Sequence, residues 1–291
     1  MKKSIALKEL IRNRKILVMP GAQDALTARI IEQAGFQAVV LGGYASSASL
    51  LGRPDIGLLT LTEMATIVRN VTDAVDIPVL ADGDTGHGGI PNVIRSVREF
   101  ERAGAAGLLL EDQIFPKRCG HMEGKQVIEP QEMVSKLRAA VDTRNDPDLV
   151  ITARTDARAV HGLEDAVSRA NLYAEAGADL IFVEAPLSEE ELRSINEKIN
   201  APTLVNVVEG GKTPQFTASE LEDMGFAVVA FPLSSVFTTA WAIRSLMEEM
   251  KQTGSTLGCI ERMVTFDNFN RLMDLERHKA IEARYNRNRS A

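Results

Sequence analysis

The chain has 291 residues, of which 45% are hydrophobic, with a net charge of −7 and a pI near 5.3. This composition excludes a disordered chain and argues against a general basic surface that binds nucleic acid. No apolar run of about 18 residues occurs, so no transmembrane helix and no membrane partner are expected. The length exceeds that of a typical domain unless the chain forms an α/β barrel, which needs about 250 residues.

The N-terminal segment MKKSIALKELIRNRK (residues 1–15) is amphipathic and basic. It lacks the apolar stretch and small-residue cleavage site of a signal peptide, so we expect a first helix here. The chain contains only two cysteines, Cys119 and Cys259, which cannot form a disulfide framework. A reducing cytoplasm is therefore the expected location.

Eight short apolar runs follow along the chain. Each is almost continuously apolar, which is typical of parallel strands that are covered on both faces. The predicted strands are residues 16–20, 38–43, 78–84, 107–112, 149–155, 180–185, 203–208 and 227–232.

Helical patterns lie between these runs, and three of them contain an Ala-Gly pair near their ends, at residues 34–35, 103–104 and 176–177. Such a pair stops a helix before the next strand, and its repetition indicates repeated βα units. No Pro/Gly/Ser-rich linker divides the chain. We therefore predict one (β/α)₈ TIM barrel domain over residues 1–291. Its C-terminal helices, from about residue 234 to 291, exceed what closes a barrel and are expected to pack on another subunit.

Polar side chains interrupt the apolar runs at the ends of five predicted strands. The carboxyl ends of barrel strands carry the active site, so these side chains are expected to meet at one mouth. This convergence is the main argument for a site that rests on the residues alone. The residues are Asp82, Asp84, Glu111, Asp112, Arg154, Glu184 and Asn206.

The segment ADGDTGHGG suggests a metal site. Asp82 and Asp84 are two residues apart at a strand end, so they share one face. Two nearby carboxylates repel unless a cation or a proton intervenes. Together with Glu111 they suit Mg²⁺, with Mn²⁺ as an alternative, because Mg²⁺ takes one or two carboxylates and keeps waters. The alternative interpretation is a pair of helix-capping aspartates beside a glycine-rich turn.

Arg154 follows a predicted strand and should point into the same mouth, where its guanidinium could bind a substrate carboxylate bidentately. A structural ion pair with Asp156 or Glu184 is the alternative, and one guanidinium can do both. Glu184 and Asn206 could orient a substrate carboxylate or bound waters.

The segment EDQIFPKRCGH contains the most informative residue, Cys119. Lys117 and Arg118 beside it are expected to lower the pKa of the thiol. A thiol here could act as a nucleophile, a metal ligand or a general acid or base, whereas most lone cysteines are inert and buried. Glycines flank it, so we interpret residues 115–128, which we call the lid, as mobile.

The motifs DGDTGHGG, EDQ, KRCGH and ARTDA, in this order and spacing, resemble the isocitrate lyase / phosphoenolpyruvate mutase superfamily. The resemblance covers nearly the whole chain, and KRCGH is its most specific element. It implies a Mg²⁺-dependent (β/α)₈ barrel and a homotetramer that exchanges C-terminal helices between subunits. The lid cysteine implies the lyase branch, because the phosphonate mutases lack it.

The resemblance also assigns roles to individual residues. Metal binding is expected from Asp82 and Asp84, with Glu111 and Asp55 in the outer sphere. Catalysis is expected from Cys119, Arg154 and His121, which we rank above His87. Substrate contacts are expected from Gly42, Gly43, Tyr44, Gly120, Arg154, Glu184 and Asn206.

Two departures from the family bear on the substrate. Phe237 and Phe266 stand where methylisocitrate lyases carry arginines for a third carboxylate, so a tricarboxylate should bind poorly. We expect a dicarboxylate of the alkylmalate type, and specifically (2R,3S)-2,3-dimethylmalate, cleaved to pyruvate and propanoate. The alternatives are cleavage of 2-methylisocitrate, hydrolysis of oxaloacetate, phosphonopyruvate chemistry and a barrel without enzymatic activity.

Overall fold

The structure is a computed structural model that describes residues 1–286. The chain forms two compact units, Met1–Val236 and Phe237–Ala291. The boundary lies close to residue 234, where the C-terminal extension was predicted to begin. The prediction of a single domain with exchanged helices stays a prediction.

In the first unit, the described residues form one sheet of eight parallel strands in the order β1-β8-β7-β6-β5-β4-β3-β2. The ring closes where Gly21 bridges Val40 and the N–H of Ala22 donates to the Val40 carbonyl at 2.9 Å. The predicted (β/α)₈ barrel is thereby confirmed. The strands are β1 (Leu17–Pro20), β2 (Val39–Leu41), β3 (Val79–Asp82), β4 (Gly107–Glu111), β5 (Val150–Thr155), β6 (Leu180–Val183), β7 (Thr203–Asn206) and β8 (Val228–Phe231).

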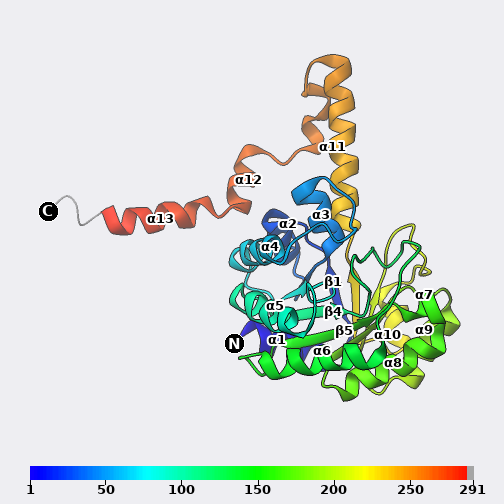
Figure 1. The fold of residues 1–291 in the computed structure, drawn as a ribbon. Helices are drawn as coiled ribbons and strands as arrows, with labels where there is room; N and C mark the ends of the chain where they lie inside the picture. Colours follow the sequence, from blue (N-terminus) through cyan, green and yellow to red (C-terminus); the bar gives the residue numbers. More distant parts are fainter. Residues whose placement is uncertain (287–291) are drawn as a thin grey trace. The chain divides into compact units, whose positions relative to one another are not determined.

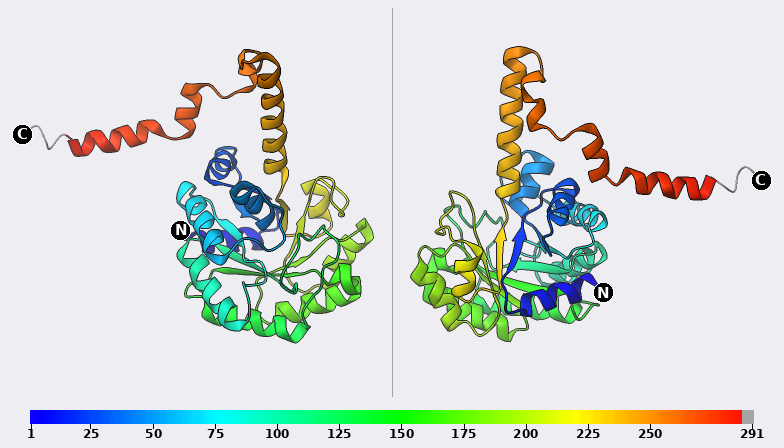
Figure 2. Two further views of the ribbon diagram at one scale, coloured as in Figure 1. Left: turned by 45° about the horizontal axis from the view of Figure 1, so that its top comes forward. Right: turned by 180° about the vertical axis from the view of Figure 1, so that it is seen from behind.

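Helices alternate with the strands and surround them (Figures 1 and 2). Two of them, α4 and α10, begin with a capping box, formed by Thr60 with Glu63 and by Thr217 with Glu220. The helices of this unit are α1 (Lys3–Arg12), α2 (Ala25–Gln33), α3 (Gly43–Leu51), α4 (Leu61–Ala74), α5 (Ile90–Arg102), α6 (Pro130–Thr143), α7 (Ala157–His161), α8 (Leu163–Glu175), α9 (Glu189–Lys198) and α10 (Ala218–Asp223).

The predicted helix stops are confirmed. Gly35, Gly104 and Gly177 follow α2, α5 and α8 with φ angles of 91°, 89° and 103°. Glycine adopts this left-handed conformation without steric cost, which turns the chain toward the next strand.

The core of the barrel has two layers. Alternate strand residues point inward and fill the interior, where Leu7 and Ile11 of α1 join them. The other strand residues point outward and pack against the surrounding helices. The predicted first helix is therefore part of the barrel core. Because side chains fill the interior, a pocket can form only at an end of the barrel.

The second unit consists of most of α11 (Ser234–Thr253), η1 (Leu257–Arg262), α12 (Phe266–Leu272) and α13 (Leu275–Asn286). Among its described residues only Cys259 is buried, whereas Trp241 is 66% exposed and Phe266 is 82% exposed. This unit therefore has almost no core of its own. Over residues 1–286, no helix is long and apolar enough to cross a membrane.

Candidate active site

A small pocket opens at the carboxyl ends of the strands. It has a volume of about 60 Å³, and every residue predicted for substrate contact or catalysis lines it. Of the predicted metal residues, Asp55 and Asp82 line it, while Asp84 and Glu111 are buried elsewhere at this mouth. The lining residues are Gly42, Gly43, Tyr44, Asp55, Asp82, Cys119, Gly120, His121, Arg154, Glu184, Asn206, Val208, Pro232 and Leu233.

The strands determine which side chains meet. Asp82, Glu111 and Asn206 are the last residues of β3, β4 and β7. Parallel pairing of β4 with β5 sets Glu111 directly beside Arg154. The expected convergence of polar strand ends is therefore confirmed for these residues.

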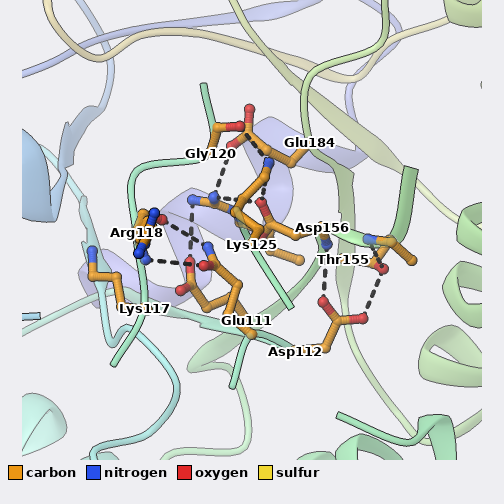
Figure 3. Close-up of polar contacts among 12 residues, drawn as sticks. Glu111, Asp112, Lys117, Arg118, Gly120, Lys125, Thr155, Asp156 and Glu184 are labelled. Carbon is orange, nitrogen blue, oxygen red and sulfur yellow. Dashed lines mark hydrogen bonds and ion pairs between the residues drawn. The ribbon is translucent and has the colours of Figure 1, made fainter. Parts of the chain in front are cut away.

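Arg154 is the centre of a buried ion cluster, whose acidic members Glu111, Asp156 and Glu184 are labelled in Figure 3. Its Nε and Nη2 atoms contact the two carboxylate oxygens of Asp156 at 2.9 and 3.0 Å. Further ion pairs reach Glu184 and Glu111, each at 3.2 Å. The structural ion pairs proposed as an alternative thus exist. They also hold the guanidinium at the pocket wall, where a substrate carboxylate could bind.

The carboxylates expected to bind metal surround a second cation, Lys117. Its Nζ atom lies 2.7 Å from Oδ1 of Asp55 and 2.7 Å from Oδ1 of Asp84. Burial alone would lower the pKa of Lys117, but the charges of Asp84 and Asp82 outweigh it and hold this pKa well above its usual value. The ammonium therefore remains charged and neutralises the carboxylates in this arrangement.

The donor set fits a hard divalent cation. Both carboxylate oxygens of Glu111 are buried and accept no hydrogen bond from the described residues, although one of them forms the ion pair with Arg154, and burial raises the pKa of Glu111 well above its usual value. Asp82 is oriented by the N–H groups of Gly43 and Asp84, each at 2.9 Å. Within the described chain, no group of three or more His, Cys, Asp or Glu side chains is arranged to hold a metal. Mg²⁺ does not need such a group, because it is held by one or two carboxylates and several waters.

The lid places Cys119 at the pocket but does not activate it as a thiolate. Burial raises the pKa of the Cys119 thiol to about 11. The expectation of a lowered pKa is wrong, because Lys117 pairs with Asp55 and Asp84, while Arg118 donates to the carbonyl of Glu123 at 3.1 Å. Cys119 is a protonated thiol at neutral pH, which suits a proton donor better than a nucleophile.

His121 lies on the other side of the pocket. Its Nδ1 atom accepts the N–H of Lys212 at 2.9 Å, and its Nε2 atom is 3.4 Å from Oε1 of Glu184. Burial lowers the pKa of His121, although the charge of Glu184 opposes this shift. The imidazole is therefore neutral near pH 7.

The sequence analysis did not identify several residues of this mouth. Val208, Pro232 and Leu233 give the pocket an apolar wall, and Lys125 of the lid is buried. Val208 and Pro232 are the last residues of the predicted strands 203–208 and 227–232, so their position at strand ends could have identified them as part of the pocket wall. Nothing in the sequence next to Lys125 indicates that this lysine is buried.

Known proteins provide an independent comparison. A family model described as phosphoenolpyruvate phosphomutase matches residues 7–251. The chain is 48% identical to 2,3-dimethylmalate lyase of Eubacterium barkeri over 279 residues, which cover 96% of each chain. It is 47% identical to a chloroplastic carboxyvinyl-carboxyphosphonate phosphorylmutase of Arabidopsis thaliana, over 97% of this chain and 84% of the relative.

A solved structure supports the same grouping. The crystal structure of a 2,3-dimethylmalate lyase, described as a member of the PEP mutase/isocitrate lyase superfamily, matches with a TM-score of 0.93 and 33% identity. The match covers 98% of this chain and 96% of that one. The predicted enzyme class, a carbon–carbon lyase, is confirmed by the named lyase among these relatives. The chain belongs to the phosphoenolpyruvate mutase/isocitrate lyase superfamily.

Proposed function

We propose that this enzyme cleaves the C2–C3 bond of a 2-hydroxy dicarboxylate, with (2R,3S)-2,3-dimethylmalate as the substrate and pyruvate and propanoate as the products. The observation that carries the proposal is a single small pocket that combines Arg154, hard carboxylates and the protonated thiol of Cys119. The 2,3-dimethylmalate lyase at 48% identity supports this choice of substrate.

The metal role falls to Asp82 and Asp84, with Glu111 and Asp55 in the outer sphere. Mg²⁺, or Mn²⁺ in its place, would supply Lewis acidity that lowers the pKa of a bound hydroxyl. The two backbone N–H groups that bind Asp82 keep its carboxylate directed at the mouth. The buried oxygens of Glu111 support the same role, because besides the ion pair with Arg154 they accept no hydrogen bond from the described residues.

The protein residues account for the rest of the chemistry. Arg154 binds a substrate carboxylate and stabilises the negative charge that develops on the departing fragment. Breaking C2–C3 leaves the electron pair on C3, and the hydroxyl proton leaves to a base. Cys119 then donates its proton to C3, which yields propanoate. His121, neutral and beside Glu184, is positioned to orient the second carboxylate.

The preference for a dicarboxylate rests on Phe237 and Phe266. Both belong to the C-terminal unit. Phenylalanine offers no cation to a third carboxylate, so 2-methylisocitrate should be a poorer substrate.

A substrate panel tests the proposal. Purified protein with Mg²⁺ is incubated separately with 2,3-dimethylmalate, 2-methylisocitrate, oxaloacetate and phosphonopyruvate, and the products are identified by mass spectrometry. We expect the largest kcat/KM for 2,3-dimethylmalate, loss of turnover in EDTA and its recovery with Mg²⁺ or Mn²⁺. If oxaloacetate is hydrolysed faster, the enzyme is an oxaloacetate hydrolase instead. No turnover of any of the four would refute the proposal.

Phosphonate chemistry is a second candidate, because the plant relative carries a phosphorylmutase name. The lid cysteine argues against it, since the resemblance places that residue in the lyase branch. Turnover of phosphonopyruvate above that of the malates would reverse this order.

We also propose a cytoplasmic homotetramer with exchanged C-terminal helices. The exposed apolar side chains of the C-terminal unit support an assembly, because monomers rarely expose so many. The two free cysteines support a reducing compartment. Analytical ultracentrifugation tests the tetramer, and a monomer at micromolar concentration would contradict it.

A further inference from the structure

Lys125 is a buried cation near the C-terminal end of the lid, and its Nζ atom joins the lid to the barrel. The ammonium donates to the carbonyl of Gly120 and to Oδ1 of Asp156, the latter at 2.8 Å (Figure 3). Its side chain is only 2% exposed. Burying an ammonium costs several kcal/mol unless it is paired, so this lysine is held by specific contacts.

The barrel side of this contact is rigid. Asp156 binds Arg154 through both carboxylate oxygens, and its N–H donates to Asp112 at 2.9 Å. Asp112 also accepts the hydroxyls of Thr155 and Tyr173, at 2.7 and 2.8 Å. Burial alone would raise the pKa of Asp156, but the charges of Arg154 and Lys125 outweigh it and hold this pKa below its usual value. Asp156 is thus a fixed anion against which Lys125 can be held.

On the lid, Lys125 binds the carbonyl of Gly120, the residue next to Cys119. Gly120 packs so closely that a Cβ atom there would lie 2.3 Å from Cδ of Glu184 and 2.5 Å from Nη2 of Arg154. The peptide that Lys125 holds therefore lies directly on the substrate-binding arginine. A displacement of this carbonyl would move Cys119 with it, because the two residues are adjacent.

Other contacts also tie the lid to the rest of the first unit: the N–H of Cys119 donates to the carbonyl of Asp55 at 3.3 Å, and Lys117 pairs with Asp55 and Asp84. Among the described residues these contacts hold residues 117–119, and none of them binds the carbonyl of Gly120.

The base of the lid is closed by the N–H of Ile114, which donates to Gln126 at 2.8 Å, and the side chain of Gln113 binds the backbone of Arg118 at 2.8 and 3.0 Å. Lys212 pairs with Glu123 at the exposed rim, where the Glu123 side chain is 89% exposed. Among the described residues, the side chain of Lys125 alone ties the carbonyl of Gly120 to a buried barrel anion.

We propose that Lys125 is a positioning residue, whose ammonium holds the lid closed against the Asp156–Arg154 pair and thereby keeps the Cys119 sulfur at the pocket. The proposal rests on the proposed role of Cys119 as the proton donor. A merely structural ion pair would stabilise the fold without controlling access to Cys119, and this difference can be measured.

The test compares Lys125→Met with Lys212→Met. Lys212 lies outside the lid, and its replacement removes the side chain that pairs with Glu123 at the lid's exposed rim, while the backbone N–H of residue 212 that binds His121 is kept. Alkylation of Cys119 by iodoacetamide at pH 8 is followed by peptide mass spectrometry, which separates it from Cys259. For Lys125→Met we expect about tenfold faster alkylation, as the loss of one charged hydrogen bond favours opening. We expect kcat to fall about 100-fold with a smaller change in KM, because the proton donor is misplaced. Lys212→Met should match the wild type in both measurements.

Folding is checked by circular dichroism and thermal melting. Asp156 keeps its bidentate pair with Arg154 in Lys125→Met, so the carboxylate is not left without a partner. If this variant does not fold, Lys125→Gln, which keeps an N–H donor on an uncharged side chain one atom shorter, carries the same alkylation test.

Two outcomes overturn the proposal. One is a folded Lys125 variant whose Cys119 reacts at the wild-type rate, whatever its kcat. The other is an equal increase in alkylation for Lys212→Met, which would mean that any loss of charge loosens the lid. Failure of the proposed function would give a different result. Cys119→Ser would then keep its turnover, whereas the alkylation of Cys119 in the Lys125 variants would still test the role of Lys125.

Discussion

The two units of this chain place charged and apolar side chains in opposite ways. The barrel unit buries Glu111, Lys117 and Arg154 at its mouth, although burial of charge is costly. The C-terminal unit buries only Cys259 among its described residues and exposes Trp241 and Phe266. Buried charge in a self-sufficient fold indicates a site for chemistry, and exposed apolar surface indicates a site for assembly.

The two cysteines provide the sharpest test of this contrast. If Cys119 is the proton donor, Cys119→Ser lowers kcat about 1000-fold, which is the range of general acid catalysis, and leaves KM nearly unchanged. Cys259→Ser is the matched control in the C-terminal unit and should keep the wild-type kcat. Steady-state kinetics with 2,3-dimethylmalate measures both. Normal turnover in Cys119→Ser would show that Cys119 at the buried mouth is not the proton donor.

Ion pairs in the two units should differ in their contribution to stability. Arg154→Met leaves Asp156, Glu184 and Glu111 without their shared cation, so the free energy of unfolding should fall by about 3 kcal/mol. Lys279→Met removes an exposed pair with Glu276 in α13 and should leave that free energy unchanged within error. Urea unfolding measures both. Equal losses would show that burial does not distinguish these pairs.

The raised pKa of Cys119 predicts a pH dependence. A pKa of about 11 instead of 9.0 means about 100-fold less thiolate at pH 8, because each pKa unit is a factor of ten. The thiol therefore stays mostly protonated below its folded-state pKa, and its alkylation rate should rise about tenfold per pH unit at pH 8 and level off only near pH 11. The rate for the folded protein is compared with that in urea. Rapid alkylation at pH 8 in the native state would restore the activated-thiolate interpretation.

The prediction with the smallest expected effect concerns the apolar surface of the C-terminal unit. Trp241→Glu introduces a charge on α11 at a side chain that is 66% exposed. If this surface is covered in the assembly, the dissociation constant should rise at least about tenfold, because an aromatic anchor is lost. Sedimentation velocity over a range of concentrations measures this. An unchanged assembly would mean that Trp241 faces solvent.

The sequence allowed most of the barrel to be predicted. Continuous apolar runs located all eight strands within two residues of their observed bounds, and Ala-Gly pairs located three helix ends. The polar strand ends also identified Asp82, Glu111, Arg154 and Asn206 as neighbours. These features depend on local pattern and on the rule that parallel strands end at one face, so they can be derived without coordinates.

The sequence could not reveal how the charges pair. Lys117 is two residues from Cys119, yet its charge goes to Asp55 and Asp84, so the expected thiolate does not form. Lys125 meets Asp156, which lies 31 residues away in the chain. A pKa depends on burial and on partners that the fold brings together, and neither is a property of neighbouring residues.

The chain's own pattern therefore determined the barrel, its repeated units and the mouth at which polar residues gather, because these follow from periodicity and strand direction. Only the tertiary structure decided which cation neutralises which carboxylate, and that Cys119 carries a proton. Electrostatic energies depend on distance and desolvation in three dimensions, and these exist only once the chain has folded.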